Sequence, residues 1–92
     1  MLRITEQRNG ERLVLKLEGR ISGDWVSEVD ASWHSAQASG ERSICVDLTD
    51  VWLVDSAGQA LLTRMYRAGV RFMARGCVLR EMVREIRAMV ES

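Results

Sequence analysis

Residues 47–62 read DLTDVWLVDSAGQALL, a stretch that joins apolar strand residues to a polar turn and the start of a helix. Residues 43–48, which overlap the start of this stretch, are mostly apolar, and this is typical of an internal strand of a parallel sheet. A second apolar run, residues 51–54, follows a polar break at Thr49-Asp50. Asp47 is therefore expected at the carboxyl end of a strand, where open α/β sheets present functional groups.

A helix is expected to follow this turn. Ser56-Ala57-Gly58-Gln59 fits the capping-box pattern, so Ser56 is predicted to cap the helix, which Gly69 ends. The helical spacing of its apolar positions predicts one buried face. Those positions are Ala57, Ala60, Leu61, Met65 and Ala68.

Upstream, the pattern predicts a β-hairpin and a first helix. Apolar and polar residues alternate over residues 2–4 and 13–17, with Asn9-Gly10 between them, which favours a type I′ turn. Asp24 is a good N-cap for the next segment, whose apolar residues recur at helical spacing up to Ala36. Gly40 then ends that helix.

Downstream, residues 70–74 predict a short strand, and apolar residues from Leu79 to Val90 recur at helical spacing. The element order is therefore β β α β α β α. Helices that join successive strands require parallel pairing, whereas the N-terminal hairpin is antiparallel. We expect an α/β fold with a single mixed sheet of about four strands and about three helices.

The composition of the chain argues against several classes of function. The 92 residues carry 13 basic and 13 acidic side chains, without the basic excess typical of nucleic-acid binders. No apolar run approaches the roughly 20 residues that span a bilayer, and the start of the chain does not resemble a secretory signal. Cys45 and Cys77 match no disulfide framework or zinc motif, and Cys45 is expected to be a buried, small apolar residue. We expect one domain that is not membrane-embedded, in the cytoplasm.

The charges are distributed unevenly. Residues 1–63 carry six basic and ten acidic side chains, whereas residues 64–92 carry seven arginines and three glutamates. The net charges are therefore −4 and +4. Such asymmetry either reflects solvated surfaces or helps to steer a partner, and the sequence favours the first interpretation.

Catalysis and metal binding are not supported by the residue patterns. Ser56 is not in a G-x-S-x-G nucleophile motif, because position 54 is Val54. His34, the only histidine, is predicted to lie in the first helix as a solvated side chain. Asp47, Asp50 and Asp55 match no calcium loop. We therefore expect no catalytic residue, no metal site and no cofactor.

Residues 47–62 resemble the STAS domain family, typified by bacterial anti-anti-sigma factors. The family carries an Asp-Leu-Ser-x-Val pattern, then Asp-Ser-x-Gly and a leucine-rich helix. Here Asp47-Leu48-Thr49-Asp50-Val51 and Asp55-Ser56-Ala57-Gly58 match those patterns. Residues 17–21 and 68–70 also fall where the family pattern expects them, so the resemblance covers residues 11–75.

The resemblance implies a non-enzymatic anti-sigma factor antagonist that is switched by phosphorylation. Ser56 is then the phosphoacceptor of a partner serine kinase that is also an anti-sigma factor, and a phosphatase reverses the modification. Asp50, Asp55, Ala57 and Gly58 would shape the docking surface together with Ser56. Asp24 also belongs to this set, two positions beyond the place of a common acidic residue of the family.

Physical chemistry supports this choice of site. A helix N-terminus offers unpaired N–H groups and the positive end of the helix dipole to a phosphate. The added negative charge beside Asp55 would disfavour a partner surface that is built for a neutral hydroxyl.

The resemblance also leaves alternatives open. Compared with the family pattern, we expect the usual final strand and helix to be missing, so that residues 1–92 would form one STAS-like domain truncated at its C-terminal end, with a sheet edge at residues 70–74. This edge, or an exposed Trp25, Trp33 or Trp52, could form a homodimer, although Trp25 and Trp33 are more typical of packing anchors. Similar domains also serve as accessory subunits of membrane transport systems that bind a cytoplasmic ATPase. A small-ligand-binding signalling domain is the third interpretation.

Overall fold

The computed structural model describes residues 1–74 and 77–91, with side-chain surroundings for residues 1–74 and 80–91. The predicted element order is confirmed. Its strands are β1 (Leu2–Asn9), β2 (Arg12–Ile21), β3 (Ser43–Val54) and β4 (Arg71–Met73). Its helices are α1 (Trp25–Ala38), α2 (Ser56–Arg67) and α3 (Cys77–Glu91).

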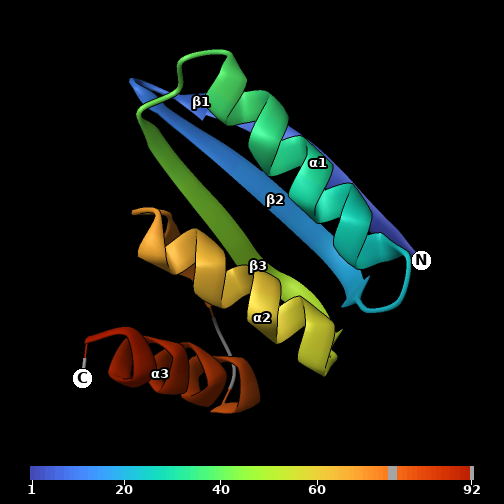
Figure 1. Cartoon of the computed structure of the whole chain (residues 1–92). Helices are drawn as coiled ribbons and strands as arrows, with labels where there is room; N and C mark the ends of the chain where they lie inside the picture. Colours follow the sequence, from blue (N-terminus) through green and yellow to red (C-terminus); the bar gives the residue numbers. More distant parts are fainter. Residues whose placement is uncertain (75–76, 92) are drawn as a thin grey trace.

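The strands form one mixed sheet, as the sequence predicts, and within it they lie in the order β1-β2-β3-β4. β1 pairs with β2 antiparallel, whereas β2–β3 and β3–β4 are parallel. Two successive right-handed crossovers in one direction place their helices on the same face of the sheet. Accordingly, α1 lies over β1 and β2, α2 lies over β3, and α3 packs beside α2 (Figure 1).

The hairpin is confirmed, but its predicted turn type is wrong. Asn9 pairs with Arg12, so the two turn residues are Gly10 and Glu11. Of these two, only Gly10 has a positive φ, 67°. A type I′ turn needs positive φ at both central residues, whereas a glycine with positive φ at the first of them is the type II′ pattern.

β3 differs from the sequence prediction because it continues through Thr49-Asp50 as one 12-residue strand. Asp47 therefore lies in the middle of a strand and not at its carboxyl end. The pairing with β2 shifts register between Lys16 and Glu18 and again between Gly19 and Arg20. These irregularities absorb the polar break that the sequence indicated.

The core lies between the sheet and the helices. Alternate residues of β2 and β3 are buried there beneath Val29, Leu61 and Met65. The strand residues in this cluster include Leu13, Leu15, Leu17, Ile44, Val46 and Leu48. On the opposite face of the sheet, which we call the open face, Val14 and Cys45 are buried beside each other outside this cluster.

Cys45 is buried, as predicted, and burial raises the pKa of its thiol. The side chain of Cys77 lies outside the described residues. Trp33 is buried and Trp25 packs against the core, whereas Trp52 is 68% exposed and lies 5.6 Å from the Arg20 guanidinium carbon. Of the three tryptophans, therefore, only Trp52 offers a large exposed ring.

Among the described residues, no helix is both long enough and apolar enough to cross a membrane.

The two faces of the sheet should differ in their contribution to stability. Replacing Leu17, which is completely buried in the helix-covered core, by alanine should lower the free energy of unfolding by about 2–5 kcal/mol. Val14→Ala should cost clearly less, because Val14 packs on the open face outside the main cluster. Urea unfolding of both variants measures the difference. Equal losses would contradict a core confined to one face.

Candidate functional site

The candidate site is the corner where β2 ends, α1 begins and α2 begins. We call it the α2 corner and define it by Ile21, Gly23, Asp55, Ser56 and Gly58. Parallel pairing sets Ile21 beside Val54, so the two strands end together. The Asp55 N–H donates to the Ile21 carbonyl at 3.1 Å, which ties the start of α2 to the end of β2.

Asp55, and not Ser56, caps α2. One carboxylate oxygen of Asp55 accepts the N–H of Gly58 at 2.7 Å, which is the side-chain cap of the helix. The other oxygen accepts the N–H of Gly23 at 3.0 Å. The hydrogen bond from the Gly58 N–H, followed in importance by that from the Gly23 N–H, holds the pKa of Asp55 below its usual value. The predicted Ser56 cap is wrong, because the helix begins one residue earlier and an aspartate occupies its N-cap.

Gly58 is buried and brings the helix close to the strand end. A Cβ atom at this position would lie 2.6 Å from the Ile21 carbonyl oxygen and 2.9 Å from a methyl carbon of Val54. The absence of a side chain is therefore a packing requirement. Gly58 therefore shapes the corner from within.

Ser56 is the first residue of α2, and its side chain is exposed. Over residues 1–74 and 77–91, the structure shows no hydrogen bond made by its hydroxyl. Because Asp55 performs the capping, the Ser56 oxygen is free to meet another molecule. Ala57, the next residue, is also exposed and adds a small apolar surface to it.

Asp24 is brought to this corner. It occupies the N-cap position of α1 but makes no side-chain capping bond, and it is exposed. Its neighbour Gly23 is bonded to Asp55, so the Asp24 backbone adjoins the start of α2. Asp24 is the N-cap residue of α1, as predicted, but its side chain makes no capping bond. Its predicted role in partner binding stays a prediction.

Asp50 is not brought to the corner. Leu15 and Leu17 face the core, so Lys16 between them faces the open side of the sheet, where its ammonium lies 3.6 Å from the Asp50 carboxylate. Asp47 instead accepts the Thr49 N–H at 2.9 Å. The three aspartates therefore do not converge, and no metal-like cluster of His, Cys, Asp or Glu occurs in the described parts of the chain.

His34 lies on α1 with its side chain 63% exposed, and its imidazole is 3.1 Å from the Asp30 carboxylate. This is an i,i+4 pair on the helix surface. The predicted solvated position is confirmed.

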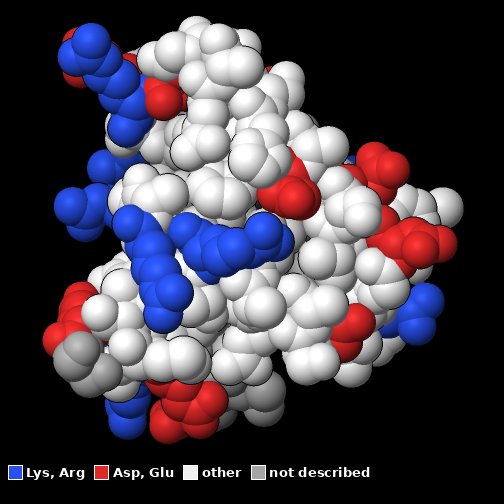
Figure 2. Space-filling model, in the orientation of Figure 1, with Lys and Arg blue, Asp and Glu red and all other residues white. Residues whose placement is uncertain are grey.

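The two ends of α2 differ in charge. Figure 2 shows a row of basic side chains across the part of the surface where α2 ends, whereas acidic side chains lie on both sides of the view. Arg64 and Arg67 lie in the last turn of α2, where cations complement the helix dipole. The charge division seen in the sequence is thus partly a spatial one.

Sequence reasoning missed the backbone groups of Ile21 and Gly23, which hold the corner together. Gly23 lies 32 positions before Asp55, and no local pattern connects the two. It also missed Leu53, which is 42% exposed two residues before Asp55. The apolar run 51–54 predicted a strand, but only the tertiary structure shows that the Leu53 side chain is exposed.

The family comparison agrees with this architecture. The family model described as "Mlab, STAS domain" matches residues 4–92, almost the whole chain. The chain belongs to the STAS domain family. No curated protein matches the sequence.

Solved structures share this STAS fold. An anti-sigma factor antagonist from Mycobacterium paratuberculosis is 17% identical with a TM-score of 0.83, over 97% of this chain and 82% of that one. The anti-sigma factor antagonist SpoIIAA in its unphosphorylated form is 18% identical with a TM-score of 0.68, over 89% and 82%. A DUF3478-family protein with a SpoIIAA-like fold from Shewanella loihica PV-4 is 14% identical with a TM-score of 0.63, over 96% and 78%. At these identities the likeness shows the fold alone.

Gly58→Ala should destabilise the domain by about 1–3 kcal/mol, because the new methyl group meets the Ile21 carbonyl. Chemical unfolding measures this loss. In an unconstrained helix the same exchange stabilises by about 1 kcal/mol, so the sign of the change is diagnostic. A gain in stability would contradict the close approach.

Asp55→Asn should lower the free energy of unfolding at neutral pH. It should also reduce the loss of stability that the wild type shows as the pH falls into the acid range. The folded-state pKa of Asp55 is lowered from its ordinary 3.8, so its ionised form stabilises the fold above that value. This contribution is lost as the pH falls through 3.8 toward the lower folded-state pKa. Thermal unfolding at pH 7 and across this acid range tests it.

The matched control for that experiment is Asp24→Asn, because Asp24 makes no capping bond. This variant should keep the acid-dependent loss of the wild type. If Asp55→Asn showed the wild-type acid profile, the proposed bridging role of Asp55 would be wrong.

Proposed function

We propose that this STAS domain is a non-enzymatic regulator that binds an anti-sigma factor through the α2 corner, and that phosphorylation of Ser56 prevents the binding. The single observation that carries the proposal is the exposed Ser56 hydroxyl, which is left unbonded at the start of α2 because Asp55 caps the helix. In this role the protein acts in the bacterial cytoplasm on transcription.

The similar solved proteins support this proposal. Two of them are anti-sigma factor antagonists, and one of these was determined in its unphosphorylated form. The partner we propose is an anti-sigma factor that is also a serine kinase, and a phosphatase restores the hydroxyl. Asp24, Asp55, Ser56 and Ala57 face such a partner, and Gly58 keeps the corner compact. Asp50 lies on the open face of the sheet, so any contact that it made with the partner would come from that face.

Phosphorylation would act by charge at the α2 corner. A phosphoserine adds about −1.5 to −2 charges at pH 7. The carboxylate of Asp55 already takes the N–H groups of Gly58 and Gly23, so these backbone donors do not compensate the phosphate. The phosphate would therefore stand beside a carboxylate in a surface that otherwise offers a neutral hydroxyl and a methyl group. A partner fitted to that surface would lose its complementarity.

The experiment compares wild type with Ser56→Asp, Ser56→Ala and Ser35→Asp. Affinity purification from the source cells identifies the partner, and titration calorimetry with the purified partner measures the affinity. Ser56→Asp should bind about tenfold or more weakly, because a buried interfacial charge without a counter-charge is strongly unfavourable. Ser35→Asp is the matched control, because Ser35 is an exposed serine on α1.

Incubation of the wild type with a serine-kinase partner and ATP should add one phosphate at Ser56, located by mass spectrometry. Ser56→Ala should bind the partner but accept no phosphate. The proposal fails if Ser56 remains unmodified and Ser56→Asp binds as tightly as the wild type.

A second candidate function uses the same corner in a membrane transport system, by binding a cytoplasmic ATPase without a phosphorylation cycle. The observation that favours it is the family description, which names the Mlab type and not a sigma-factor regulator. Recovery of a transporter ATPase by both the wild type and Ser56→Ala would select this candidate.

A further inference from the structure

The edge strand β4 leaves one side of the sheet unpaired. β4 pairs with β3 and is the last strand of the sheet, and within residues 1–74 and 77–91 no further strand pairs with its outer side. Backbone N–H and C=O groups that point away from such an edge are a template for pairing with another chain. β4 is only three residues long, so side-chain contacts must supplement any backbone pairing.

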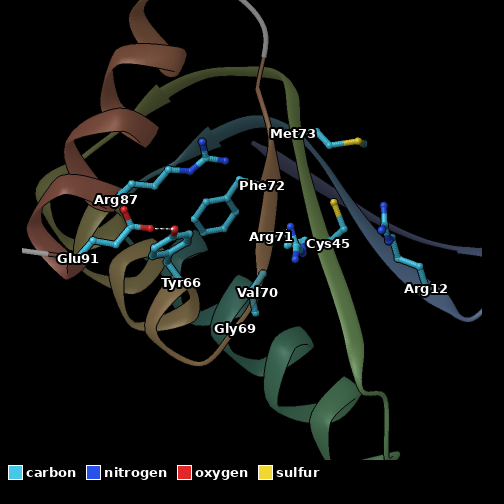
Figure 3. Close-up of a pocket in the computed structure, with 10 residues that line it drawn as sticks. All are labelled: Arg12, Cys45, Tyr66, Gly69, Val70, Arg71, Phe72, Met73, Arg87 and Glu91. Atoms are coloured by element: carbon cyan, nitrogen blue, oxygen red, sulfur yellow. Dashed lines mark hydrogen bonds between the residues drawn. The ribbon is translucent and has the colours of Figure 1, made fainter.

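A hollow follows this edge on both faces of the sheet. It has a volume of about 750 Å³. Figure 3 shows Arg12, Cys45, Arg71 and Met73 on one side of β4, and Tyr66, Phe72, Arg87 and Glu91 on the other. A hollow that straddles a strand suits an extended chain lying along the edge better than a compact small molecule.

A second hollow of about 300 Å³ adjoins the first, since both are lined by Phe72 and Arg87. It adds Arg80 and Arg84 of α3, and Val83 and Ala74 contribute apolar lining. We call the two hollows together the β4 groove. It runs between the edge strand and α3.

The β4 groove is basic. Arg12, Arg71 and Arg87 are exposed, and over residues 1–74 and 77–91 none of them forms an ion pair. Glu91 is the acidic residue among the described lining, and its carboxylate accepts the Tyr66 hydroxyl at 2.7 Å. That hydrogen bond raises the pKa of Tyr66, so the phenol stays protonated and the pair is preserved at neutral pH.

We propose that the β4 groove binds an acidic segment of a partner protein, which adds to β4 as an extended strand. Side chains of an added strand alternate between the two faces of the sheet. Adjacent carboxylates of the segment would therefore reach Arg71 on the open face and Arg87 on the helix face. Phe72 supplies the apolar contact between them.

Charge distinguishes this occupant from a second copy of the chain. An edge-to-edge dimer through β4 would bring two sets of unpaired arginines together, and like charges across an interface are unfavourable. An acidic segment meets the same arginines with opposite charge. The groove therefore favours a different chain over the homodimer that the sequence left open for this edge.

The β4 groove is separate from the proposed Ser56 switch. Tyr66 lies ten positions after Ser56 on α2, which corresponds to about 15 Å along the helix axis. An acidic segment in the groove and a partner at the α2 corner could therefore be bound together. Failure of one proposal leaves the other untouched.

The test uses a fluorescein-labelled, eight-residue peptide in which Glu-Glu-Val-Thr occurs twice, with binding measured by fluorescence anisotropy. The wild type should bind it saturably. The double variant Arg71→Ala with Arg87→Ala should bind about tenfold or more weakly, because two charge-assisted contacts are lost. Arg3→Ala with Arg64→Ala is the matched control, since these exposed arginines lie outside the groove and the net charge changes equally.

Two further peptides separate strand addition from simple charge attraction. A peptide with lysine in place of glutamate should not bind. A peptide that keeps its glutamates but is N-methylated at alternate backbone nitrogens cannot pair fully with an edge, and it should bind clearly more weakly than the parent. In NMR spectra of the wild type, amide shifts should centre on residues 71–74 and not on Ser56.

The proposal is overturned if the acidic peptide does not saturate, if both double variants lose affinity equally, or if N-methylation leaves affinity unchanged. It is also overturned if sedimentation shows a dimer that the Arg71→Ala and Arg87→Ala variant lacks, because the occupant is then a second copy. The NMR measurement on unmodified protein decides the matter if the double variant fails to fold.

Discussion

The Asp55 carboxylate joins two chain segments that lie 32 positions apart, because one oxygen accepts the N–H of Gly58 and the other accepts that of Gly23. The same residue donates its own N–H to the Ile21 carbonyl. The ends of β2 and β3, the loop before α1 and the first turn of α2 therefore meet at one side chain and its backbone. Gly58 makes this possible, since the gap to Ile21 leaves no space for a Cβ atom.

This arrangement has a direct chemical consequence for Ser56. A serine at the N-cap of a helix usually accepts a backbone N–H group, but here Asp55 occupies the N-cap and performs that task. The hydroxyl is consequently presented at a helix end whose position is fixed by hydrogen bonds from two other segments. The proposed modification at this point would change the charge of the surface more than the conformation beneath it, which would suit the reversible docking proposed above.

The one-sided arrangement of helices also separates two surfaces of the domain. α2 carries the aspartate-capped corner at its start and the basic groove beside its last turn. The open face of the sheet holds the Lys16–Asp50 ion pair. A small domain can thus offer distinct surfaces to more than one partner, because the rigid sheet fixes their relative positions.

Particular residues show why only part of the site was predictable. Ser56 was assigned to the first turn of a helix, and this was correct because local turn chemistry and helical spacing both act within a few residues. The prediction that Ser56 caps the helix was wrong, because the charged carboxylate of Asp55 competes for the same backbone N–H groups. Asp50 was grouped with Ser56 because the family motif carries both residues in one strand-turn-helix stretch, and Thr49-Asp50 was expected to interrupt the strand. In the sheet, β3 continues through this pair and the Lys16 contact holds Asp50 on the open face.

The amino-acid sequence by itself determined the order of strands and helices, the mixed sheet and the helical position of Ser56, because periodicity and turn residues are local properties of the chain. Its motif also indicated the STAS family. The tertiary structure alone decided which aspartate caps α2, which aspartate lies away from the α2 corner and where the basic residues form a groove. Parallel crossovers bring residues 32 positions apart into hydrogen-bond contact, and no local pattern records such contacts.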